Sequence, residues 1–529
     1  MLQPQTQSPA YWTTNLKVTR ADIEALFAHF LETEQPLTTR EVALFFIRQR
    51  LAAEFEHFRE QLKHVTLFQP AKHYEIGQEL IFPALNFASG KVVGLRRGHN
   101  PDYGQFSVIE VAFGEKRREF AADLNAPHPL NEVSHDLNVL FNAVQPDPEA
   151  IFERYGEAII EALEARLVDE PQAVYVGGYW FVRGLVAEAS VAHLHLAEAV
   201  LDLREGGPAS AEELLPDLDF APELPLPLRV FSLNVALSQD ERFDNVGADG
   251  DVRWFLRRLE PPEVQQIPPR LEYQPINYDA GRLTPELREL EIELGDEFSE
   301  LPQLPKPPRE VHIRLIYPHR RMGTLPMNAY LEAMLPPATE ARHLLITLID
   351  GQTEERFGAW VVREGRYLCG LNDFYRRHKL PIGAHLTFRA TEHPSQFVID
   401  FKGHRPRTEY IRLAIPSGGR LRFENFKRSI GAEYDELMIL GAEDIDGVDE
   451  VWNITRNRRR SLSDILNDLL PELARLMPQQ TVHAKTLYSA VNIMRRCPPG
   501  PIFATLLSRP EFEAVGNGYW RMASGGAQT

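Results

Sequence analysis

The sequence predicts an α+β protein that is built from several domains. Its 529 residues are enough for three to five domains, each with a core of its own. The chain is 43% hydrophobic and 25% charged, which is typical of globular proteins. Segments with the helical apolar period alternate with segments in which apolar and polar residues take turns, as they do in half-buried strands. Proline-rich and acidic stretches separate some of these regions and are typical of linkers.

Composition excludes several classes of protein. The longest apolar runs are too short to span a membrane, and the N-terminal residues lack the charged-then-apolar pattern of a signal peptide. The two cysteines, Cys369 and Cys497, make neither a metal-binding motif nor a disulfide framework. We therefore expect a cytoplasmic protein with no membrane partner.

Residues 18–67 are expected to form a helical domain. Ile23, Leu26, Phe27 and Phe30 have the spacing of one buried helical face. After a Gln-Pro-Leu turn, Thr38 or Thr39 can cap the next helix, with Glu41 in its first turn. This order of helix, Pro-Leu-Thr turn and helix resembles the opening of winged-helix domains.

Residues 68–132 change to the strand period. Alternating runs cover 74–82, 91–95, 106–113 and 116–121, with glycines between them, and they predict a small five-stranded barrel. The pattern resembles the Tudor-like barrels of transcription and chromatin proteins. Because such barrels bind proteins as often as nucleic acid, one group of basic residues is left without an assigned partner: Arg96, Arg97, Lys116, Arg117 and Arg118.

Residues 146–260 are expected to form a second winged-helix-like domain that ends in a hairpin wing. Helices are predicted over 146–167, 190–204, 210–215 and 226–238, with Ser210 as a cap, and one strand over 174–181. The pattern Phe-x-x-Val-Gly, a turn and then Trp254 predicts the hairpin.

The same hairpin pattern returns with Trp520 at the end of a third such domain, residues 452–523. Helices are predicted there over 461–477, 484–495 and 499–508. Residues 461–522 resemble the HARE-HTH winged helix, which also occurs in the RNA polymerase delta subunit. Both tryptophans are expected to be buried against their helices, with Val246 or Val515 beside them.

Two stretches are interpreted as linkers. Residues 261–308 are rich in proline and acid around one amphipathic piece, and residues 441–449 are acidic. A basic run follows the second linker, and its arginines can hold DNA phosphates or pair with the acidic run before them. These arginines are Arg456, Arg458, Arg459 and Arg460.

Residues 309–440 carry the pattern of a small barrel. Strands are predicted over 312–317, 343–349 and 384–389, and short helices over 328–334 and 372–378. The order of these signals across 311–402 resembles the DNA-binding pseudobarrel of plant transcription factors of the auxin-response-factor type. Related barrels carry target recognition in some restriction enzymes.

The resemblance implies that two arms enter the major groove of DNA, residues 319–324 and 363–367. Arginine suits such an arm because its planar fork reaches two guanine acceptors at once. Replacing Arg320, Arg321, Arg363 or Arg366 is expected to flatten sequence preference. The full set of residues expected to contact DNA is Arg320, Arg321, Thr324, Arg363, Arg366, Arg376, Arg377, Lys379, Lys402, Arg405, Arg407, Arg456, Arg458, Arg459 and Arg460.

The distribution of charge favours double-stranded DNA as the partner, although the whole chain has a net charge of −18. Residues 305–430 contain 21 Lys and Arg against 12 Asp and Glu, a net charge of +9, so the remainder carries −27. A basic region in acidic surroundings is the electrostatic footprint of a DNA-binding module.

No catalytic motif is present: there is no phosphate-binding loop, no His-Glu-x-x-His and no Gly-x-Ser-x-Gly. We therefore expect a non-enzymatic bacterial DNA-binding protein without cofactor or metal, either a transcription regulator or a DNA-sensing component of a restriction or defence system. The alternative is a scaffold whose winged helices and small barrel bind RNA polymerase or another protein. The sequence does not fix the oligomeric state.

Overall fold

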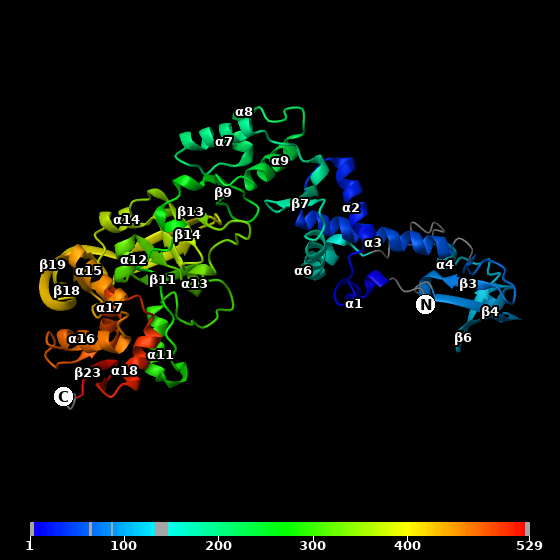
Figure 1. Cartoon of the computed structure of the whole chain (residues 1–529). Helices are drawn as coiled ribbons and strands as arrows, with labels where there is room; N and C mark the ends of the chain where they lie inside the picture. The colour runs from blue at the N-terminus through cyan, green and yellow to red at the C-terminus, as the bar shows by residue number, and fades with distance from the viewer. Residues whose placement is uncertain (1–4, 63–65, 86–87, 133–145, 524–529) are drawn as a thin grey trace. The chain divides into compact units, whose positions relative to one another are not determined.

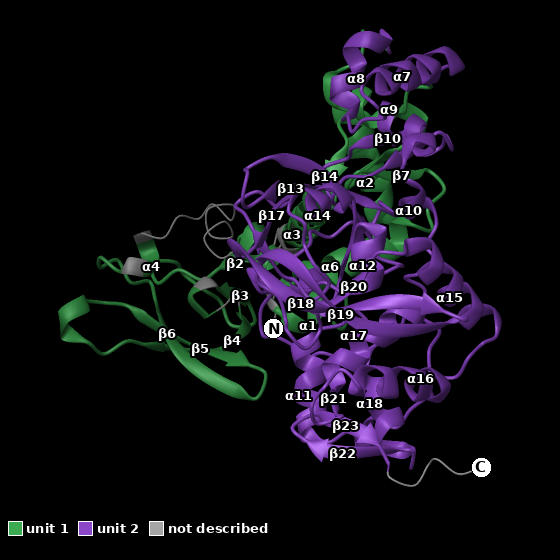
Figure 2. Ribbon diagram, turned by 90° about the vertical axis from the view of Figure 1, so that its left-hand side faces the viewer, with its two compact units in different colours: residues 1–188, 221–232 green, residues 189–220, 233–529 purple. Residues whose placement is uncertain are grey.

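The computed structural model of the chain describes residues 5–62, 66–85, 88–132 and 146–523. It is a mixed α and β protein with several sheets, in agreement with the predicted class. The chain divides into two compact units, coloured separately in Figure 2: unit 1 contains residues 1–188 and 221–232, and unit 2 contains residues 189–220 and 233–529. Residues 63–65 and 86–87, which belong to the first two expected domains, lie outside the described residues. Among the helices described, none has the length and apolar character needed to cross a membrane.

Unit 1 contains a helical module that a sheet interrupts (Figure 1). The expected helical face is confirmed, since Ile23, Leu26 and Phe30 are buried, and Thr38 is the residue that exchanges capping bonds with Glu41. The module contains α2 (Arg20–Thr33), β1 (Leu37–Thr38), α3 (Thr39–Leu62), α6 (Pro148–Leu167), β7 (Ala173–Val176) and β8 (Tyr179–Val182).

The strand expected over residues 174–181 is instead the β7–β8 hairpin. Gly177 and Gly178 take φ values of +64° and +81° and reverse the chain, which two residues with positive φ do in a tight hairpin turn. The strand β1 pairs with β8, with Leu37 opposite Trp180, so the sheet order is β1-β8-β7. The helices of residues 18–67 therefore form one module with a hairpin that lies far along the chain.

Between α3 and α6 the chain forms a five-stranded sheet, and this number of strands agrees with the predicted five-stranded barrel. Its first long strand starts at Glu79 rather than at Tyr74, because the chain turns at Gly77, where φ is +98°. Phe68, Tyr74 and Phe82 are at the centre of its core. The strands pair in chain order and are β2 (Thr66–Leu67), β3 (Glu79–Phe82), β4 (Ala88–Arg97), β5 (Ser107–Phe113) and β6 (Lys116–Ala122).

An order of three helices and a hairpin occurs twice more along the chain. The C-terminal module also has a short strand after its first helix, where the middle module has a single bridge residue, Ala209. The middle module contains α7 (Val191–Leu203), α8 (Ala211–Leu218), α9 (Leu226–Ser238), β9 (Phe243–Asn245) and β10 (Trp254–Leu256), and Ser210 caps α8 as expected. The C-terminal module contains α16 (Leu462–Ala474), β21 (Val482–His483), α17 (Ala484–Met494), α18 (Pro499–Ser508), β22 (Phe512–Gly516) and β23 (Tyr519–Met522).

A buried tryptophan occupies the same position in all three modules. Trp180, Trp254 and Trp520 are buried on the second strand of each hairpin. Their partners are Leu37, Ala209 and Val482, which each lie between the first two helices of their module. The expected burial of Trp254 and Trp520 is thus confirmed, and Val246 is buried as well. The expectation for Val515 is wrong: its side chain is 49% exposed, because the pairing register shifts between Ala514 and Gly516 at a β-bulge.

A seven-stranded, nearly closed barrel-like sheet forms the centre of unit 2. Its strand order is β11-β16-β17-β13-β14-β15-β12, and all pairs are antiparallel except β13 with β17. The two edge strands are consecutive in the chain, and α12 (Tyr317–Met322) joins them. The strands are β11 (Glu310–Arg314), β12 (Thr324–Pro326), β13 (Leu344–Asp350), β14 (Arg356–Val362), β15 (Tyr367–Cys369), β16 (His385–Ala390) and β17 (Gln396–Phe401).

The period-two pattern predicts this sheet correctly in most places. Along β13, buried and half-buried side chains alternate, and Ile346 and Leu348 meet Leu386 and Phe397 in one core. The expected short helices are α13 (Ala329–Glu332) and α14 (Asn372–Arg377). Residues 312–317 are a strand only as far as Arg314, and α12 begins at Tyr317, because Pro318 sits in its first turn.

A long hairpin follows the seven-stranded sheet and was not predicted. It consists of β18 (Gly403–Ser417) and β19 (Arg420–Ala432), and β20 (Leu440–Ala442) pairs in parallel with β18. Gly418 and Gly419, with φ of +58° and +73°, make its turn.

Both stretches interpreted as linkers are instead packed parts of unit 2. Leu283, Leu287 and Leu294 share a core with the helices of the C-terminal module, and the last two lie on α11 (Pro285–Leu294). The acidic stretch 441–449 contains the end of β20 and the start of α15 (Ile445–Asn457). Ile316 and Tyr317 belong to the same core, so the seven-stranded sheet and the C-terminal module are not independent.

Candidate nucleic-acid interface

A basic groove of about 480 Å³ lies in unit 2 between the short helices of the seven-stranded sheet and the long hairpin. α12 and α14 supply residues to one side, and β18, β19 and β20 supply residues to the other. Apolar side chains line its deeper part, among them Tyr317, Ile382 and Leu413. The charged residues in its lining are Arg320, Arg321, Arg376, Lys379, Arg428 and Glu443.

The groove has more positive than negative charge in its lining. Glu443 pairs with Arg428, and Arg321 pairs with Asp449 at 3.2 Å. Within the described residues, the side chains of the other three cations, Arg320, Arg376 and Lys379, have no carboxylate partner. An anion in the groove would therefore meet cations that no internal carboxylate already neutralises.

Arg320 is held in place by neutral groups. Its Nε donates to the carbonyl oxygen of Leu380 at 2.9 Å, and its guanidinium lies 5.7 Å from the ring centre of Tyr375. Burial lowers the pKa of Arg320, and the charge of Arg376 lowers it further. Because a guanidinium stays protonated in proteins, this lowered pKa means that the cation is poorly compensated where it lies.

The approach of α12 and α14 depends on Gly323. This residue ends α12 with a φ of +65°, which only glycine adopts readily. A Cβ at this position would lie 2.7 Å from the Cβ of Asn372, the first residue of α14. Any side chain at position 323 would thus push apart the two helices that carry the groove cations.

The two arms that the sequence suggests are not free loops. Residues 319–322 lie in α12, where His319 is buried, and Thr324 is fully buried in β12, where its Oγ1 is 2.8 Å from Nδ1 of His319. Residues 363–366 form the turn between β14 and β15, and Tyr367 begins β15. Arg363 donates to the carbonyl oxygen of Pro336 at 2.7 Å and Arg366 to that of Glu297 at 2.9 Å. Thr324 has no exposed surface with which to contact DNA.

The remaining expected contact residues of this region fall into two groups. Arg377 pairs with Glu355 at 2.5 Å, and Lys402 pairs with Glu433 at 3.0 Å. Arg405 and Arg407 are exposed on β18 without a side-chain partner among the described residues. Arg407 lies opposite Ile430, and directly opposite residues share a face, so Arg407 stands on the face of the hairpin that lines the groove.

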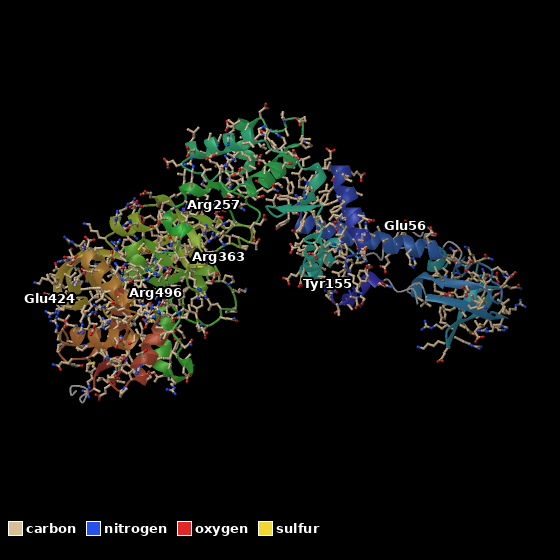
Figure 3. The ribbon with its side chains drawn as sticks, viewed as in Figure 1. Glu56, Tyr155, Arg257, Arg363, Glu424 and Arg496 are labelled. Atoms are coloured by element: carbon tan, nitrogen blue, oxygen red, sulfur yellow. The ribbon has the colours of Figure 1, made fainter. Side chains whose placement is uncertain are left out.

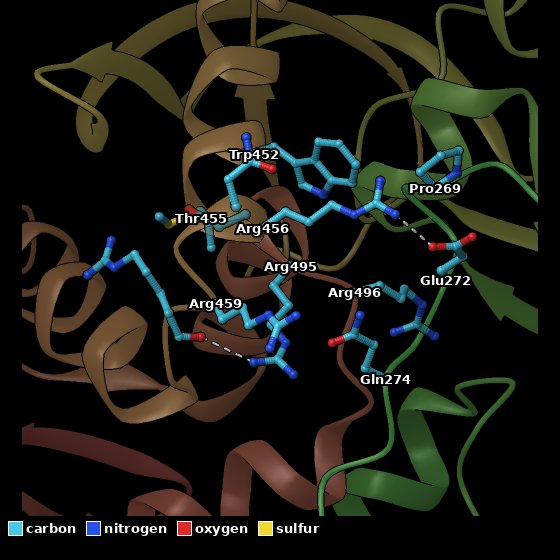
Figure 4. Close-up of a pocket in the computed structure, with 12 residues that line it drawn as sticks. Pro269, Glu272, Gln274, Trp452, Thr455, Arg456, Arg459, Arg495 and Arg496 are labelled. Atoms are coloured by element: carbon cyan, nitrogen blue, oxygen red, sulfur yellow. Dashed lines mark hydrogen bonds and ion pairs between the residues drawn. The ribbon is translucent and has the colours of Figure 1, made fainter.

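A second basic cavity, of about 470 Å³, lies beside α15 (Figure 4). Trp452, Thr455 and Arg456 of α15 line it together with Arg459 and Arg495 and with the segment that contains Glu272. Arg495 donates to the carbonyl oxygen of Arg460 at 3.2 Å rather than to a carboxylate. We call this cavity the arginine pocket.

The sequence leaves two alternatives for the basic run at the end of α15: its arginines hold DNA phosphates, or they pair with the acidic stretch before them. Arg456 pairs with Glu272 at 3.1 Å, and Arg460 pairs with Asp468 at 2.6 Å. Neither carboxylate belongs to the acidic stretch 441–449, so the expected pairing with that stretch is wrong. Arg458 and Arg459 are exposed, and no ion pair holds them within the described residues.

A buried charge network lies next to these basic surfaces. Arg496 donates to both carboxylate oxygens of Asp296 at 2.7 Å and also reaches Glu297, whose Oε1 is 3.0 Å from Nε2 of His319. Tyr488 donates to Asp296 at 2.5 Å. Burial would raise the pKa of Glu297, but Arg496 and His319 outweigh burial and bring it down to about 2. Burial raises the pKa of Asp296.

Sequence reasoning missed the contribution of the hairpin and of the end of α17. Arg428 completes the groove, and Arg495 the arginine pocket. The signal for the hairpin is present in the sequence, where Ser-Gly-Gly-Arg separates two alternating runs.

Both cysteine thiols are buried, and burial raises the pKa of each to about 12, so neither is suited to act as a nucleophile.

Neither a protein-family model, nor a curated protein, nor a solved structure matches the chain.

Proposed function

We propose that this protein binds double-stranded DNA, and that the groove between α12, α14 and the long hairpin holds a stretch of the phosphate backbone. The observation that carries the proposal is a set of three groove cations that have no carboxylate partner in the described part of the chain, Arg320, Arg376 and Lys379. Lysine and arginine contacts to phosphate supply most of the salt-dependent affinity of such proteins. The net charge of +9 over residues 305–430 supports the same assignment.

The long hairpin extends this basic surface. Arg407 continues the groove face of β18, and on the opposite face Nζ of Lys427 lies 5.3 Å from the ring centre of Tyr410. Tyr410 is nevertheless 65% exposed. Because cations contact phosphates, the exposed Arg407 extends the surface that can meet the DNA backbone.

We expect this surface to contact the phosphate backbone of DNA rather than to read the edges of the bases. Base reading needs side chains that project freely into a groove of DNA. Arg363 and Arg366 are bonded to backbone carbonyl groups instead. We therefore expect modest sequence preference from this surface.

We further propose that the three helical modules are winged helices that serve mainly as protein-contact or structural elements. In the C-terminal module, the third helix α18 is buried over most of its length, with Gly500 against Tyr278. In unit 1, the third helix α6 exposes Glu153, Glu157 and Glu161, which would repel phosphate. The protein-scaffold alternative is thus favoured for unit 1.

The test is a salt titration of duplex binding by the full chain, followed by fluorescence anisotropy. The double variant Arg376→Ala/Lys379→Ala removes two cations that make no ion pair with any residue that the structure describes. If each contacts one phosphate, the slope of log K against log salt should fall in magnitude by about 2.

The matched control is Lys116→Ala/Arg118→Ala, which changes the net charge equally at two exposed residues of β6. Its slope should equal that of the parent. Absence of salt-dependent binding by the full chain, or an unchanged slope in Arg376→Ala/Lys379→Ala, would refute the proposal.

A further inference from the structure

Three side chains of the types that bind metals converge in unit 2, away from the basic groove. They are Asp244 on β9, Glu260 after the short helix η5 (Arg257–Leu259), and His343 immediately before β13. Each offers one ligand atom, and these atoms all lie within 4.8 Å of one another. Nδ1 of His343 lies 4.0 Å from Oδ2 of Asp244.

Two of these buried ligand groups each have one atom without a hydrogen-bond partner among the described residues. Glu260 is 6% exposed and His343 is 5% exposed, and neither Oε1 of Glu260 nor Nδ1 of His343 has a partner within the described residues. A buried polar atom without a partner is costly and rare in folded proteins. Both atoms belong to the same cluster, so a single ligand between them would satisfy both.

The two carboxylates of the cluster lie together in a mostly buried position, where Arg257 lies 3.6 Å from Oδ1 of Asp244. A cation placed among the three groups would be attracted by both carboxylates.

We propose that Asp244, Glu260 and His343 bind a divalent transition-metal ion of the zinc type. One imidazole nitrogen and two carboxylate oxygens form a donor set that suits such ions, and they leave a fourth position for water. Ligand atoms around Zn²⁺ are roughly 3–3.5 Å apart, so the side chains must close in by about an ångström.

The metal would join two parts of unit 2. Asp244 and Glu260 flank the hairpin of the middle module, whereas His343 precedes a central strand of the seven-stranded sheet. These parts already touch beside the cluster, where the rings of Phe255 and Trp360 are 4.9 Å apart, edge to face. A bound ion would thus act as a structural cross-link, because a metal bound only by the native state stabilises that state.

The test uses the full chain without an affinity tag, stripped with a chelator and dialysed. Zn²⁺, and in a separate arm Mn²⁺, is added during isothermal titration calorimetry and during thermal unfolding. Binding of one equivalent with a rise of several degrees in Tm is expected for at least one of the two ions. Co²⁺ should give the visible absorption of a bound ion rather than that of the hydrated ion.

The variants Glu260→Gln and His343→Gln should keep the circular dichroism of the parent but lose the stoichiometric binding and the Tm rise. The control His312→Gln changes an exposed histidine that also neighbours a carboxylate, Glu310, on β11 of the same sheet. It should bind metal as the parent does. No stoichiometric binding of either ion to the parent, or undiminished binding by both cluster variants, would overturn the assignment.

Discussion

Replacing Arg496 by methionine should destabilise unit 2 severely. Arg496 is 1% exposed and donates hydrogen bonds to Asp296, Glu297 and Asn492, while its guanidinium lies 5.1 Å from the ring centre of Phe298. Methionine fills much of the same volume but leaves two fully buried carboxylates without their main cation. Removal of one partner from a buried ion pair typically costs about 3–5 kcal/mol.

The effect should be measured locally, because a chain of several domains does not unfold in one step. Hydrogen exchange followed by mass spectrometry reports on peptides from α17 and from residues 296–298. A loss of about 3–5 kcal/mol corresponds to exchange that is roughly 10²–10⁴-fold faster wherever global opening controls it.

Two further variants test whether the unpaired buried carboxylates cause the loss of stability. Arg521→Met removes an arginine from an exposed pair with Glu513 on the C-terminal hairpin, where the two side chains are 46% and 43% exposed, and it should leave exchange close to that of the parent. Adding Asp296→Asn and Glu297→Gln to Arg496→Met should restore much of the protection, because the buried charges are then gone. If Arg496→Met exchanges no faster than Arg521→Met, the network does not stabilise unit 2 and the reasoning fails.

The remaining predictions concern pH and the hairpin tryptophans. Since the pKa of Glu297 falls from an ordinary 4.5 to about 2 in the folded state, its contribution to stability is complete above about pH 4.5 and is lost as the pH falls toward 2. The urea midpoint of unit 2 should drop across that range, and Arg496→Met should show a smaller drop. Trp254→Phe removes the 2.8 Å bond from Nε1 to Oδ1 of buried Asn234 and should cost about 1–3 kcal/mol beyond the change in packing. Trp520→Phe should cost less, because Nε1 of Trp520 has no partner within the described residues, and equal losses in the two variants would contradict this.

The sequence predicts those parts of the fold whose signal is local. Alternation along β13 and β16, the capping serine Ser210 and the hairpin tryptophans each lie within a few residues of the element that they define. The proline in the first turn of α12 is also a local signal, and it identifies as a helix the stretch that the family resemblance maps to an arm. In this segment the local sequence signal therefore predicts the structure better than the family resemblance does.

Features that depend on distant partners are not predicted. Asp296 and Glu297 lie in a stretch with the composition of a linker. They are part of a core because Arg496, which comes 200 residues after Asp296, binds them there. The ligand groups of the proposed metal site are likewise spread over 99 residues, from 244 to 343. Four of the predicted DNA contacts line the groove, but their shared position depends on the packing of α12 against α14 and the hairpin.

The interrupted module of unit 1 has a consequence for synthesis. Leu37 and its partner Trp180 are 143 positions apart, so at 5–20 residues per second the ribosome needs roughly 7–30 s to deliver the second after the first. Until then α2 and α3 have no hairpin to cover Ile23, Leu26 and Phe30, whereas the five-stranded sheet is complete once Ala122 has been made. The inserted sheet can therefore fold before its host, and nascent chains that stall within residues 123–173 would expose the apolar face of the host helices to chaperones.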